Sequence, residues 1–419
     1  MMDSLQINSD RLWARIAELA QIGAIPDTYG CSRLALTDED KEGRDLVVTW
    51  MRDLGMEVSI DGVGNVVGTW FGDHTDHALP PVMTGSHIDT VRTGGRFDGN
   101  LGVLAGLEIV EVLIENSFSP LHPISVGFFT GEEGARFAPD MLGSLVYVGG
   151  MSVETAHDIN GIDGKRFGDE LERIGFLGNA PCPGPVPKAF LELHIEQGPV
   201  LEASEIAIGA VDSVQGISWT EISIDGQSNH AGTTPMHMRR DAGFAVSQIA
   251  TFVRQLALDL GGNQVGTVGM INLQPNLVNV VASEALMTVD LRNTDDEVLK
   301  NAEKQVQEFC LALSKSENVE IASKVLARFE PVSFDQALVK DIISTSESLN
   351  LSVNQMTSGA GHDAQMFARV CPSAMIFVPS KHGLSHNPAE YTSQDQISDG
   401  ANVLLQVLMN LAKENNERT

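Results

Sequence analysis

PVMTGSHIDTVRTGGRFDGNLGVLAGLEIVEVLI, residues 81–114, is the stretch that decides the fold. Its apolar start, 81–85, predicts a strand, and Leu101–Ile114 predicts a strongly apolar helix. A second buried strand, Ile124–Thr130, follows the helix. Strand, helix and strand in this order predict an α/β fold, a mostly parallel central sheet with helices on both faces.

The residues before this stretch continue the same alternation. Amphipathic helices are predicted over Asp10–Gln21 and Asp38–Leu54, and short strands over Met56–Ile60 and Asn65–Trp70. Thr37 or Asp38 is a suitable N-cap for the second helix, because both side chains accept hydrogen bonds from free helix amides.

The order of elements changes after about residue 212. The predicted elements there are a strand 218–225, a helix 238–260, strands 264–273 and 285–292, a helix 295–313 and a strand 319–327. This β-α-β-β-α-β order is ferredoxin-like. The α/β pattern then resumes with a helix 335–349, strands 353–357 and 374–378, and a closing helix Ser393–Glu414.

We therefore expect two domains. The α/β domain is predicted in two parts, 1–212 and 332–419, and the small α+β domain, 213–331, is inserted between them. A chain of 419 residues exceeds the size at which a single hydrophobic core stops growing, which agrees with this division.

Composition restricts the partners and the compartment. The formal charge of −29 disfavours nucleic acid and anionic membrane surfaces. The cysteines, Cys31, Cys182, Cys310 and Cys371, show no paired spacing, which favours free thiols in a reducing compartment. Met1–Ala20 lacks the pattern of a signal peptide, and no apolar run is long enough to span a membrane, so the cytoplasm is the expected location.

Histidines and carboxylates recur at the predicted strand ends. His87 and Asp89 follow the strand of the opening stretch, and in extended chain they point the same way, so that the carboxylate can orient a metal-binding imidazole. Asp98 lies between glycines in front of the apolar helix, where a tight turn can aim its carboxylate inward. Ligands collect at this edge of open α/β sheets.

Three more strand ends carry such residues. Glu132 and Glu133 follow Ile124–Thr130, and His194 and His386 stand at or after later strands. Each has an ordinary alternative: Asp98 as a helix N-cap, the two glutamates as a solvated acidic turn, and each histidine as a structural residue. Their coincidence at core strand ends favours a centre for two divalent ions, Zn²⁺ or Mn²⁺, with Co²⁺ or Ni²⁺ as substitutes.

The chain resembles the metal-dependent amidohydrolases of the hydantoinase/carbamoylase group within the M20 peptidase-like superfamily, nearly from end to end. The motifs that carry the resemblance are Gly-Ser-His-Ile-Asp-Thr (85–90), Gly-Gly-Arg-Phe-Asp-Gly (94–99), Glu-Glu-Gly-Ala-Arg-Phe (132–137), Leu-His-Ile-Glu-Gln-Gly (193–198), Asn-His-Ala-Gly-Thr-Thr-Pro (229–235), Gly-Ala-Gly-His-Asp-Ala (359–364) and Ser-His-Asn-Pro (385–388). A histidine at position 194, where the peptidase branches commonly have aspartate, favours the carbamoylase branch.

The resemblance implies two ion sites that share one carboxylate. His87, Asp98 and His194 would hold one ion, and Asp98, Glu133 and His386 the other. Glu132 would be the general base. His382 lies four residues before His386 and competes as a ligand on residue type, and the motif selects His386.

Substrate contacts are also implied by the resemblance. His230 would reach the active site of a partner subunit and polarise the reacting carbonyl, and Asn279 and Arg292 would bind the substrate carboxylate. Gly361 and His362 would touch the substrate as well. Gln197, beside His194, would bind the ureido group or act as a ligand.

The expected activity is removal of an N-carbamoyl (ureido) group from a small carboxylate, which yields an amino acid, ammonia and carbon dioxide. N-carbamoyl-L-amino acids are the first choice of substrate, and allantoate amidohydrolase and β-ureidopropionase activities are the close alternatives. An aminoacylase or peptidase activity and a non-catalytic, metal-containing ureido binder are the remoter ones. The inserted domain is expected to act as a lid and as the surface of a homodimer.

Overall fold

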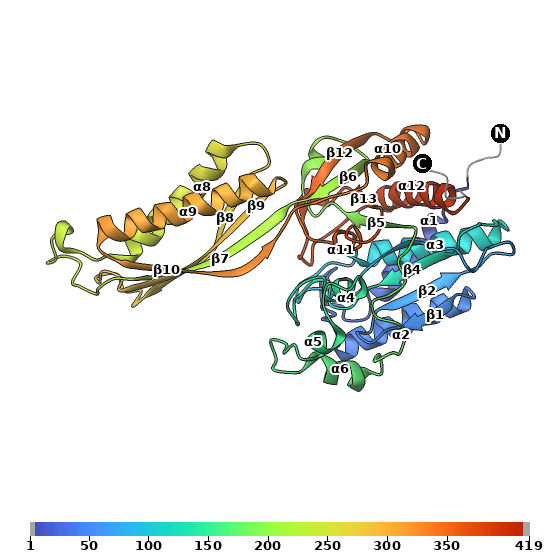
Figure 1. Ribbon diagram of the computed structural model, residues 1–419, viewed down its shortest axis with the longest axis horizontal. Helices are drawn as coiled ribbons and strands as arrows, with labels where there is room; N and C mark the ends of the chain where they lie inside the picture. The colour runs from blue at the N-terminus through green and yellow to red at the C-terminus, as the bar shows by residue number, and fades with distance from the viewer. Residues whose placement is uncertain (1–4, 414–419) are drawn as a thin grey trace. The chain divides into compact units, whose positions relative to one another are not determined.

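The computed structural model describes residues 5–413 and divides into two compact units (Figure 1). Within the described residues, unit 1 comprises 5–212 and 333–413, and unit 2 comprises 213–332. The chain ends of the predicted domains, 1–4 and 414–419, lie outside the described residues, and so does Glu414, the predicted end of the last helix.

Unit 1 contains a sheet and the helices around it. Its strands are β1 (Glu57–Ile60), β2 (Val66–Trp70), β3 (Val82–Ser86), β4 (Ile124–Phe128), β5 (Ala189–Ile195), β6 (Ile208–Val214), β11 (Val332–Ser333), β12 (Val353–Ser358) and β13 (Ser373–Val378). Its helices are α1 (Ser9–Leu19), α2 (Asp38–Asp53), α3 (Asn100–Glu115), α4 (Leu142–Tyr147), α5 (Val153–His157), α6 (Phe167–Ile174), α7 (Val200–Ala203), α10 (Gln336–Ser348), α11 (Asp363–Phe367), α12 (Gln394–Lys413) and the 3₁₀ turn η2 (Lys381–Gly383).

The sheet is parallel at its centre. Among the described residues its order is β1-β2-β4-β3-β5-β13-β6-β11, with β12 paired to β6. The neighbours β4-β3-β5-β13 run parallel, and β1, β2 and β6 join antiparallel. The four central strands are buried along their whole length, as expected for parallel strands covered by helices. The predicted α/β class with a mostly parallel central sheet is confirmed.

Helix α3 connects the opening stretch to the core. Almost all of its residues up to Leu113 are buried, because it packs against β3, β4 and β5 at the centre of the unit. The close approach needs glycine: a Cβ at Gly102 would lie 2.6 Å from the main-chain oxygen of Leu193 in β5. The first turn of α3 is thereby held beside the carboxyl ends of the strands.

Unit 2 has its own sheet and its own core. Its elements are β7 (Gly216–Asp225), the 3₁₀ turn η1 (Met236–Met238), α8 (Ala242–Leu260), β8 (Val265–Gln274), β9 (Glu284–Asn293), α9 (Asp296–Glu317) and β10 (Glu320–Phe329). The sheet is antiparallel in the order β10-β7-β9-β8, and helices α8 and α9 lie along it (Figure 1). Apolar residues of both helices and of the strands form one buried core. This is the ferredoxin-like order of elements.

Two helix boundaries in unit 2 differ from the prediction by four residues. The helix predicted to end at 313 continues to Glu317 in α9, and the start of α8 differs as well. The sequence places a helix start at 238, whereas α8 begins at Ala242 after the separate turn η1. The Asp241 side chain accepts a hydrogen bond from the Phe244 amide and so caps α8 at this point.

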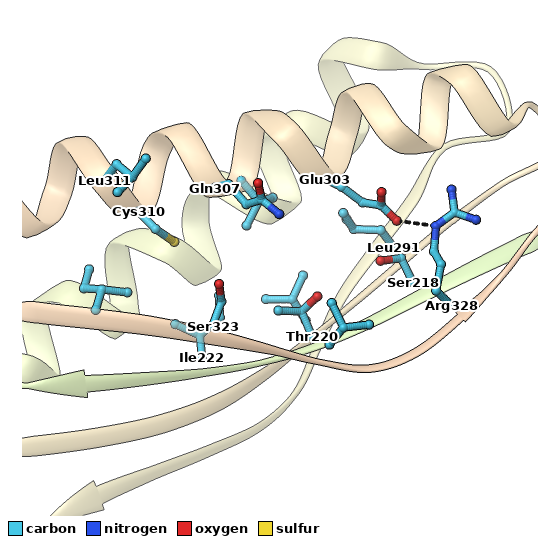
Figure 2. Close-up of a pocket in the computed structure, with 14 residues that line it drawn as sticks. Ser218, Thr220, Ile222, Leu291, Glu303, Gln307, Cys310, Leu311, Ser323 and Arg328 are labelled. Carbon is cyan, nitrogen blue, oxygen red and sulfur yellow. Dashed lines mark ion pairs between the residues drawn. The ribbon is translucent and has the colours of Figure 1, made fainter. Parts of the chain in front are cut away.

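A cavity of about 410 Å³ lies between α9 and the strands of unit 2 (Figure 2). Small hydroxyl side chains of Ser218, Thr220 and Ser323 line its floor, and the Glu303–Arg328 ion pair lies at one end. The residues that line it include none of the predicted site residues.

No helix in the described part of the chain combines the length and apolar composition that crossing a bilayer requires.

Candidate metal centre and active site

Four adjacent parallel strands bring the predicted ligands to one edge of the sheet of unit 1. His87 directly follows β3, and Glu132 and Glu133 lie in the turn after β4. His194 is in the last residues of β5, and His386 follows β13. Because neighbouring parallel strands end on the same side of a sheet, these residues meet although they are far apart in sequence.

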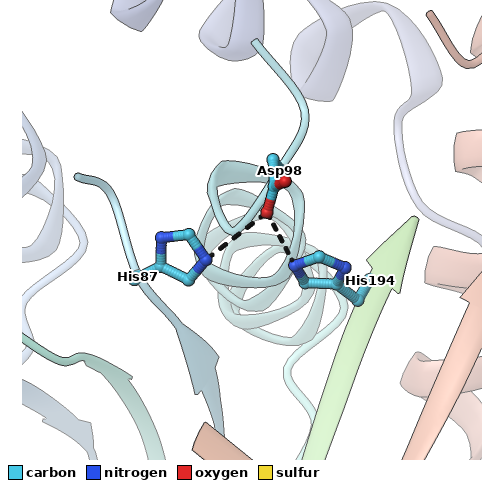
Figure 3. A group of neighbouring side chains, drawn as sticks. All are labelled: His87, Asp98 and His194. Atoms are coloured by element: carbon cyan, nitrogen blue, oxygen red, sulfur yellow. Dashed lines mark ion pairs between the residues drawn. The ribbon is translucent and has the colours of Figure 1, made fainter. Parts of the chain in front are cut away.

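His87, Asp98 and His194 form a closed cluster at this edge (Figure 3). Asp98 Oδ1 lies 3.5 Å from His87 Nε2 and 3.1 Å from His194 Nε2. The three side chains are 1%, 5% and 0% exposed, so water has little access to the cluster. Although burial raises it, hydrogen bonds and charge from the two imidazoles in their protonated form hold the pKa of Asp98 well below its usual value, with His194 the larger cause.

Main-chain oxygens set the tautomers of both imidazoles. His87 Nδ1 lies 2.9 Å from the main-chain oxygen of Asp89, and His194 Nδ1 lies 2.8 Å from that of Ile195. A carbonyl only accepts, so each Nδ1 carries the proton and each Nε2 faces Asp98. The Gly99 amide donates to His194 Nε2 at 3.1 Å, which agrees with a lone pair on that atom.

The atom of Asp89 that orients His87 therefore differs from the prediction. The sequence assigns this contact to the carboxylate of Asp89, whereas the structure assigns it to the main-chain oxygen. The Asp89 carboxylate accepts from the Gly131 amide at 3.1 Å and so ties the loop after β3 to the turn after β4. Burial raises the pKa of Asp89 to about 6.

A second cluster shares Asp98 through its other oxygen. His386 Nε2 lies 3.5 Å from Asp98 Oδ2 and 3.1 Å from Glu133 Oε2. The His386 side chain is 51% exposed, so this cluster opens to solvent where the first is closed. The Glu133 carboxylate raises the pKa of His386 to about 9, against the effect of burial.

These distances fit metal binding. Two ligands that bind one tetrahedral Zn²⁺ with bonds of about 2.1 Å lie about 3.4 Å apart. The imidazole–carboxylate separations in both clusters, 3.1–3.5 Å, match this value. The donor set of imidazoles and carboxylates suits Zn²⁺ or Mn²⁺. The residues present therefore fit two divalent cations with Asp98 between them.

The helix N-cap alternative for Asp98 is wrong. The N-cap of α3 is Gly99, at a φ of 66°, and no side chain caps the helix. A Cβ at position 99 would lie 2.4 Å from His87 Nε2, so glycine is required both for the left-handed turn and for the space beside His87. The turn aims the carboxylate of Asp98 into the cluster.

Glu132 and Glu133 point to different partners. Glu132 Oε2 lies 3.3 Å from His87 Nε2, in the closed cluster, whereas Glu133 faces His386. Glu132 is 7% exposed, and burial, despite the opposing effect of His87, raises its pKa well above the usual value. Nearby carboxylates, with Asp363 first among them, add to this shift.

His362 and Glu192 lie next to His194. Glu192, His194 and His362 form a third buried group, and the rings of His194 and His362 are 4.6 Å apart. Ser358 Oγ lies 2.9 Å from His362 Nε2, and burial followed by the charge on His194 lowers the pKa of His362 well below its usual value. His362 is therefore a neutral imidazole.

Sequence reasoning assigns no role to Glu192 or Glu390, which are both buried next to ligands. Glu192 accepts from Ser86 Oγ at 2.6 Å and from the Ala364 amide at 2.8 Å. It lies two residues before His194 in the same strand, so strand alternation is a signal for it. Glu390 follows His386 by a short stretch of loop and has no comparable signal.

Gln197 and Gly361 lie in unit 1 near these groups. Gln197, at a φ of 57°, donates from Nε2 to Asp98 Oδ2 at 2.8 Å. Gly361 directly precedes His362, and a Cβ there would lie 2.9 Å from the Met141 side chain.

The other predicted substrate residues belong to unit 2. His230 is exposed, and its neighbour Ala231 donates from its amide to the main-chain oxygen of Asn279, so His230 and Asn279 lie on adjacent segments. Arg292, in β9, holds Asp290 through Nε at 3.1 Å and Nη2 at 2.9 Å.

His382 does not join a ligand group among the described residues. Its side chain is 72% exposed, and Nδ1 lies 3.8 Å from a carboxylate oxygen of Glu202. The structure thus places His386, and not His382, beside Asp98.

Known proteins are similar to this chain over almost its whole length. The family model described as peptidase family M20/M25/M40 matches residues 83–410. An N-carbamoyl-L-amino-acid amidohydrolase of Rhizobium meliloti is 40% identical over 412 residues and covers 98% of both chains. An allantoate amidohydrolase of Escherichia coli (strain K12) is 37% identical, over 94% of this chain and 96% of its own.

A solved structure agrees closely in backbone. An amidase of the hydantoinase/carbamoylase family from Burkholderia multivorans has a TM-score of 0.94 and 42% identity, over 98% of this chain and 100% of its own.

Proposed function

Because the chain belongs to peptidase family M20/M25/M40, and to its hydantoinase/carbamoylase group, we propose that it is a metal-dependent amidohydrolase that removes the N-carbamoyl group of small carboxylates. N-carbamoyl-L-amino acids are the proposed substrates. The observation that carries the proposal is the position of Asp98, whose two oxygens face two separate ligand groups beside Glu132. This arrangement supports a centre for two metal ions, of the kind that two-metal hydrolases use.

The proposed ligands are His87, Asp98 and His194 for the closed group and Asp98, Glu133 and His386 for the open one. Two divalent cations, Zn²⁺ or Mn²⁺ with Co²⁺ or Ni²⁺ as substitutes, would lower the pKa of water and polarise the ureido carbonyl when bound. The low exposure of the first group excludes solvent and strengthens every charge interaction inside it.

Glu132 is the proposed general base. Its carboxylate takes a proton from the attacking water and later gives it to the leaving nitrogen, so the side chain must be buried, able to gain and lose a proton, and uncommitted to an ion. Glu132 is buried and lies beside His87, whereas Glu133 faces His386. These positions support Glu132 as the base and Glu133 as a ligand. The raised pKa of Glu132 favours its acceptance of a proton from water.

The overall reaction then balances. Water adds to the carbamoyl carbon, the bond from that carbon to the amino nitrogen breaks, and the released carbamate gives ammonia and carbon dioxide. The amino acid leaves with a free amine that carries the returned proton.

His230, Asn279 and Arg292 are proposed to act on the substrate from unit 2. An imidazole can donate to the developing oxyanion, and an arginine fork suits a carboxylate. His362, a buried neutral imidazole next to His194, and its neighbour Gly361 are proposed substrate contacts in unit 1. Gln197 is proposed to contact the ureido group, although its amide nitrogen donates to Asp98.

We also propose a homodimer in which unit 2 is the lid and supplies His230 to the partner, as the family resemblance implies. The exposure of His230 is compatible with such a role. A cytoplasmic location is proposed from the four free cysteines, since disulfides are rare in reducing compartments.

The second candidate is allantoate hydrolysis, which the Escherichia coli relative favours. Allantoate and N-carbamoyl amino acids share a ureido group and a carboxylate, so the same centre serves both. A non-catalytic ureido binder needs no general base. The buried carboxylate of Glu132, beside His87, therefore argues against that alternative. β-Ureidopropionase activity, which also acts on a ureido group and a carboxylate, is the other close alternative, and aminoacylase and peptidase activities are the remoter ones.

One substrate panel tests the proposal. The purified protein with Mn²⁺ is offered N-carbamoyl-methionine, N-carbamoyl-β-alanine, allantoate, N-acetyl-methionine and a dipeptide, and ammonia and amine release are both measured. We expect equal release of ammonia and amino acid from N-carbamoyl-methionine. Amine release from N-acetyl-methionine or the dipeptide alone would replace the proposal with an aminoacylase or peptidase activity.

A further inference from the structure

The segment after β13 is anchored to the loop that carries Asp98. Glu390 Oε1 accepts from the amides of Phe97 at 3.0 Å and of Asp98 at 3.2 Å. Glu390 is 1% exposed, so these hydrogen bonds are shielded from water. A shielded hydrogen bond is electrostatically stronger than one at the surface. One side chain thus joins two loops that each carry a candidate ligand.

The same segment also reaches the Asp98 carboxylate. Ser385 Oγ lies 2.8 Å from Asp98 Oδ2 and 3.3 Å from Glu390 Oε2. Gln197 Nε2 donates to the same oxygen of Asp98. The two oxygens of Asp98 therefore have different surroundings: Oδ1 faces His87 and His194, and Oδ2 faces Ser385, Gln197 and His386.

Two packing features fit the carboxylate of Glu390 closely to this loop. A Cβ at Gly95 would lie 2.1 Å from Glu390 Oε1, so only glycine leaves room for the carboxylate. The ring of Tyr391 meets the ring of Phe97 edge-on, with centroids 6.0 Å apart. The segment after β13 therefore packs closely against the loop that carries Asp98 at several residues.

We propose that Glu390 is a positioning residue for the metal centre: through the Asp98 main chain and through Ser385 it orients the Asp98 carboxylate so that each oxygen faces its own ligand group. This inference rests on the proposed function, because it assigns Asp98 to two ions. A bridging carboxylate tolerates little rotation, and partners of metal ligands typically change metal affinity by about 10–100-fold when removed.

The alternative is that Glu390 merely fastens the last segment of the chain to unit 1. A fastening role changes stability and leaves metal binding as it was. Asp61 offers a matched control, because it is 4% exposed, accepts from the amides of Val63 and Asn65, and has no proposed metal ligand among its hydrogen-bond partners.

The experiment compares Glu390→Ala, Glu390→Gln, Ser385→Ala and Asp61→Ala in the full chain. Affinity for Co²⁺ is measured by competition with a chelator, the visible absorption of bound Co²⁺ reports ligand geometry, and thermal unfolding of the chelated protein reports stability. We expect Glu390→Ala to weaken Co²⁺ binding by about 10–100-fold and to change the absorption bands. Glu390→Gln keeps an oxygen for the two amides and should restore affinity to within about threefold.

Ser385→Ala removes the hydroxyl that contacts Asp98 Oδ2 and Glu390 Oε2 but keeps the hydrogen bonds of Glu390 to the two amides, and it serves if Glu390→Ala does not fold. It should weaken the binding of one Co²⁺ equivalent and spare the other. Asp61→Ala should lower the unfolding temperature with affinity and spectrum unchanged.

Two results would overturn the proposal. One is Co²⁺ affinity and absorption unchanged in Glu390→Ala and in Ser385→Ala, with a loss of stability like that of Asp61→Ala. The other is a wild-type protein that binds no Co²⁺, which would end the two-metal assignment as well. A wild type that binds Co²⁺ but cleaves no ureido compound would refute the proposed function alone, since the affinity and spectral readouts need no substrate.

Discussion

Gly99 lies between Asp98, a proposed metal ligand, and the first turn of helix α3, and both its backbone conformation and its surroundings require glycine. It is at a φ of 66°, and a Cβ there would lie 2.4 Å from the ring of His87. Left-handed backbone costs a non-glycine residue about 1–2 kcal/mol, and the collision adds to that cost. Two separate penalties therefore act at one position.

A matched pair of variants separates these penalties. Gly99→Ala should destabilise the fold by about 1–2 kcal/mol and also weaken metal binding by more than about tenfold, because His87 must move. Gly164→Ala also places a side chain at a positive φ, 74°, but with nothing within 4 Å of the added Cβ. Urea unfolding and chelator competition measure the two effects, and equal metal affinity in both variants would contradict the collision.

Glu132 and Glu133 are adjacent and chemically identical, yet they should respond differently to the same substitution. Glu132→Gln should keep both ions and lower kcat by about 10²–10⁴-fold, because the proton acceptor is lost. Glu133→Gln should instead weaken metal binding, because Glu133 belongs to the open ligand group. Steady-state kinetics and metal titration on both variants test this, and a Glu132→Gln enzyme with unchanged kcat would remove Glu132 from the role of base.

Residue types at the site could be predicted from the sequence, and their hydrogen bonds could not. Motifs identify His87 and Asp98 as ligand candidates, because imidazoles and carboxylates coincide at several core strand ends and in the turns after them. The contact of His87 with the main-chain oxygen of Asp89, and not with its carboxylate, depends on where the turn after β4 offers the Gly131 amide. Such a choice is made by tertiary structure.

At the scale of elements, periodicity predicts the long helices and buried strands well. The helix α3 and strand β4 follow from the apolar pattern alone. Strand β6 is not predicted, because Ile208–Val214 contains Gly209, Asp212 and Ser213 and so shows neither an unbroken apolar run nor a regular alternation. The short helices α4, α5, α7 and α11 span too few residues to show a helical period.

Helix α12 carries like charges one turn apart and permits a pH test. Burial, and then the charge on Asp395, raises the pKa of Asp399. A raised pKa in the folded state means that ionised Asp399 costs stability above the ordinary aspartate pKa, and that this cost fades as pH falls through the folded value. Because Asp399 is partly exposed, we set the stability cost of its charge at that of an i,i+4 pair of like charges, about 0.2–0.5 kcal/mol.

Asp399→Asn should therefore stabilise the protein by about 0.2–0.5 kcal/mol near pH 7 and by less near pH 5. Urea unfolding at the two pH values measures the difference. Asp395→Asn removes the same repulsion but also an acidic residue from the first turn of α12, where the helix dipole favours it, so its gain should be smaller. A gain that grows towards pH 5 would contradict the assignment.

At the scale of the whole molecule, all proposed metal ligands belong to unit 1. An ion that binds only the folded state at about 100 times its Kd stabilises it by about 2.7 kcal/mol. Unit 2 has its own apolar core and contains none of the ligands. Chelation should therefore lower the unfolding temperature of unit 1 selectively.

Tryptophan positions allow the two units to be followed separately. Trp13, Trp50 and Trp70 lie in unit 1, and Trp219 lies in unit 2. In a Trp219→Phe chain, fluorescence reports unit 1 alone and should shift to lower temperature with chelator. A chain with Trp219 as its only tryptophan should not shift, and an equal shift in both chains would mean that the ions stabilise the units together.

The order of strands in the sheet of unit 1 could not be predicted from the sequence. Periodicity identifies β13 as a strand, but nothing local says that it lies between β5 and β6. That position depends on pairings between residues almost two hundred positions apart, such as Phe377 with His194. Only the packed sheet decides among such pairings.

The anchoring of Glu390 to Phe97 and Asp98 has a consequence for synthesis on the ribosome. Chains emerge from the N-terminus, and early domains fold first. His87, Asp98, Glu133 and His194 are all made before unit 2, whereas His386 and Glu390 come after it. All three proposed ligands of the closed group are therefore synthesised before unit 2. The proposed open group lacks His386 for the whole time that unit 2 is translated, and it is complete only when translation is almost finished.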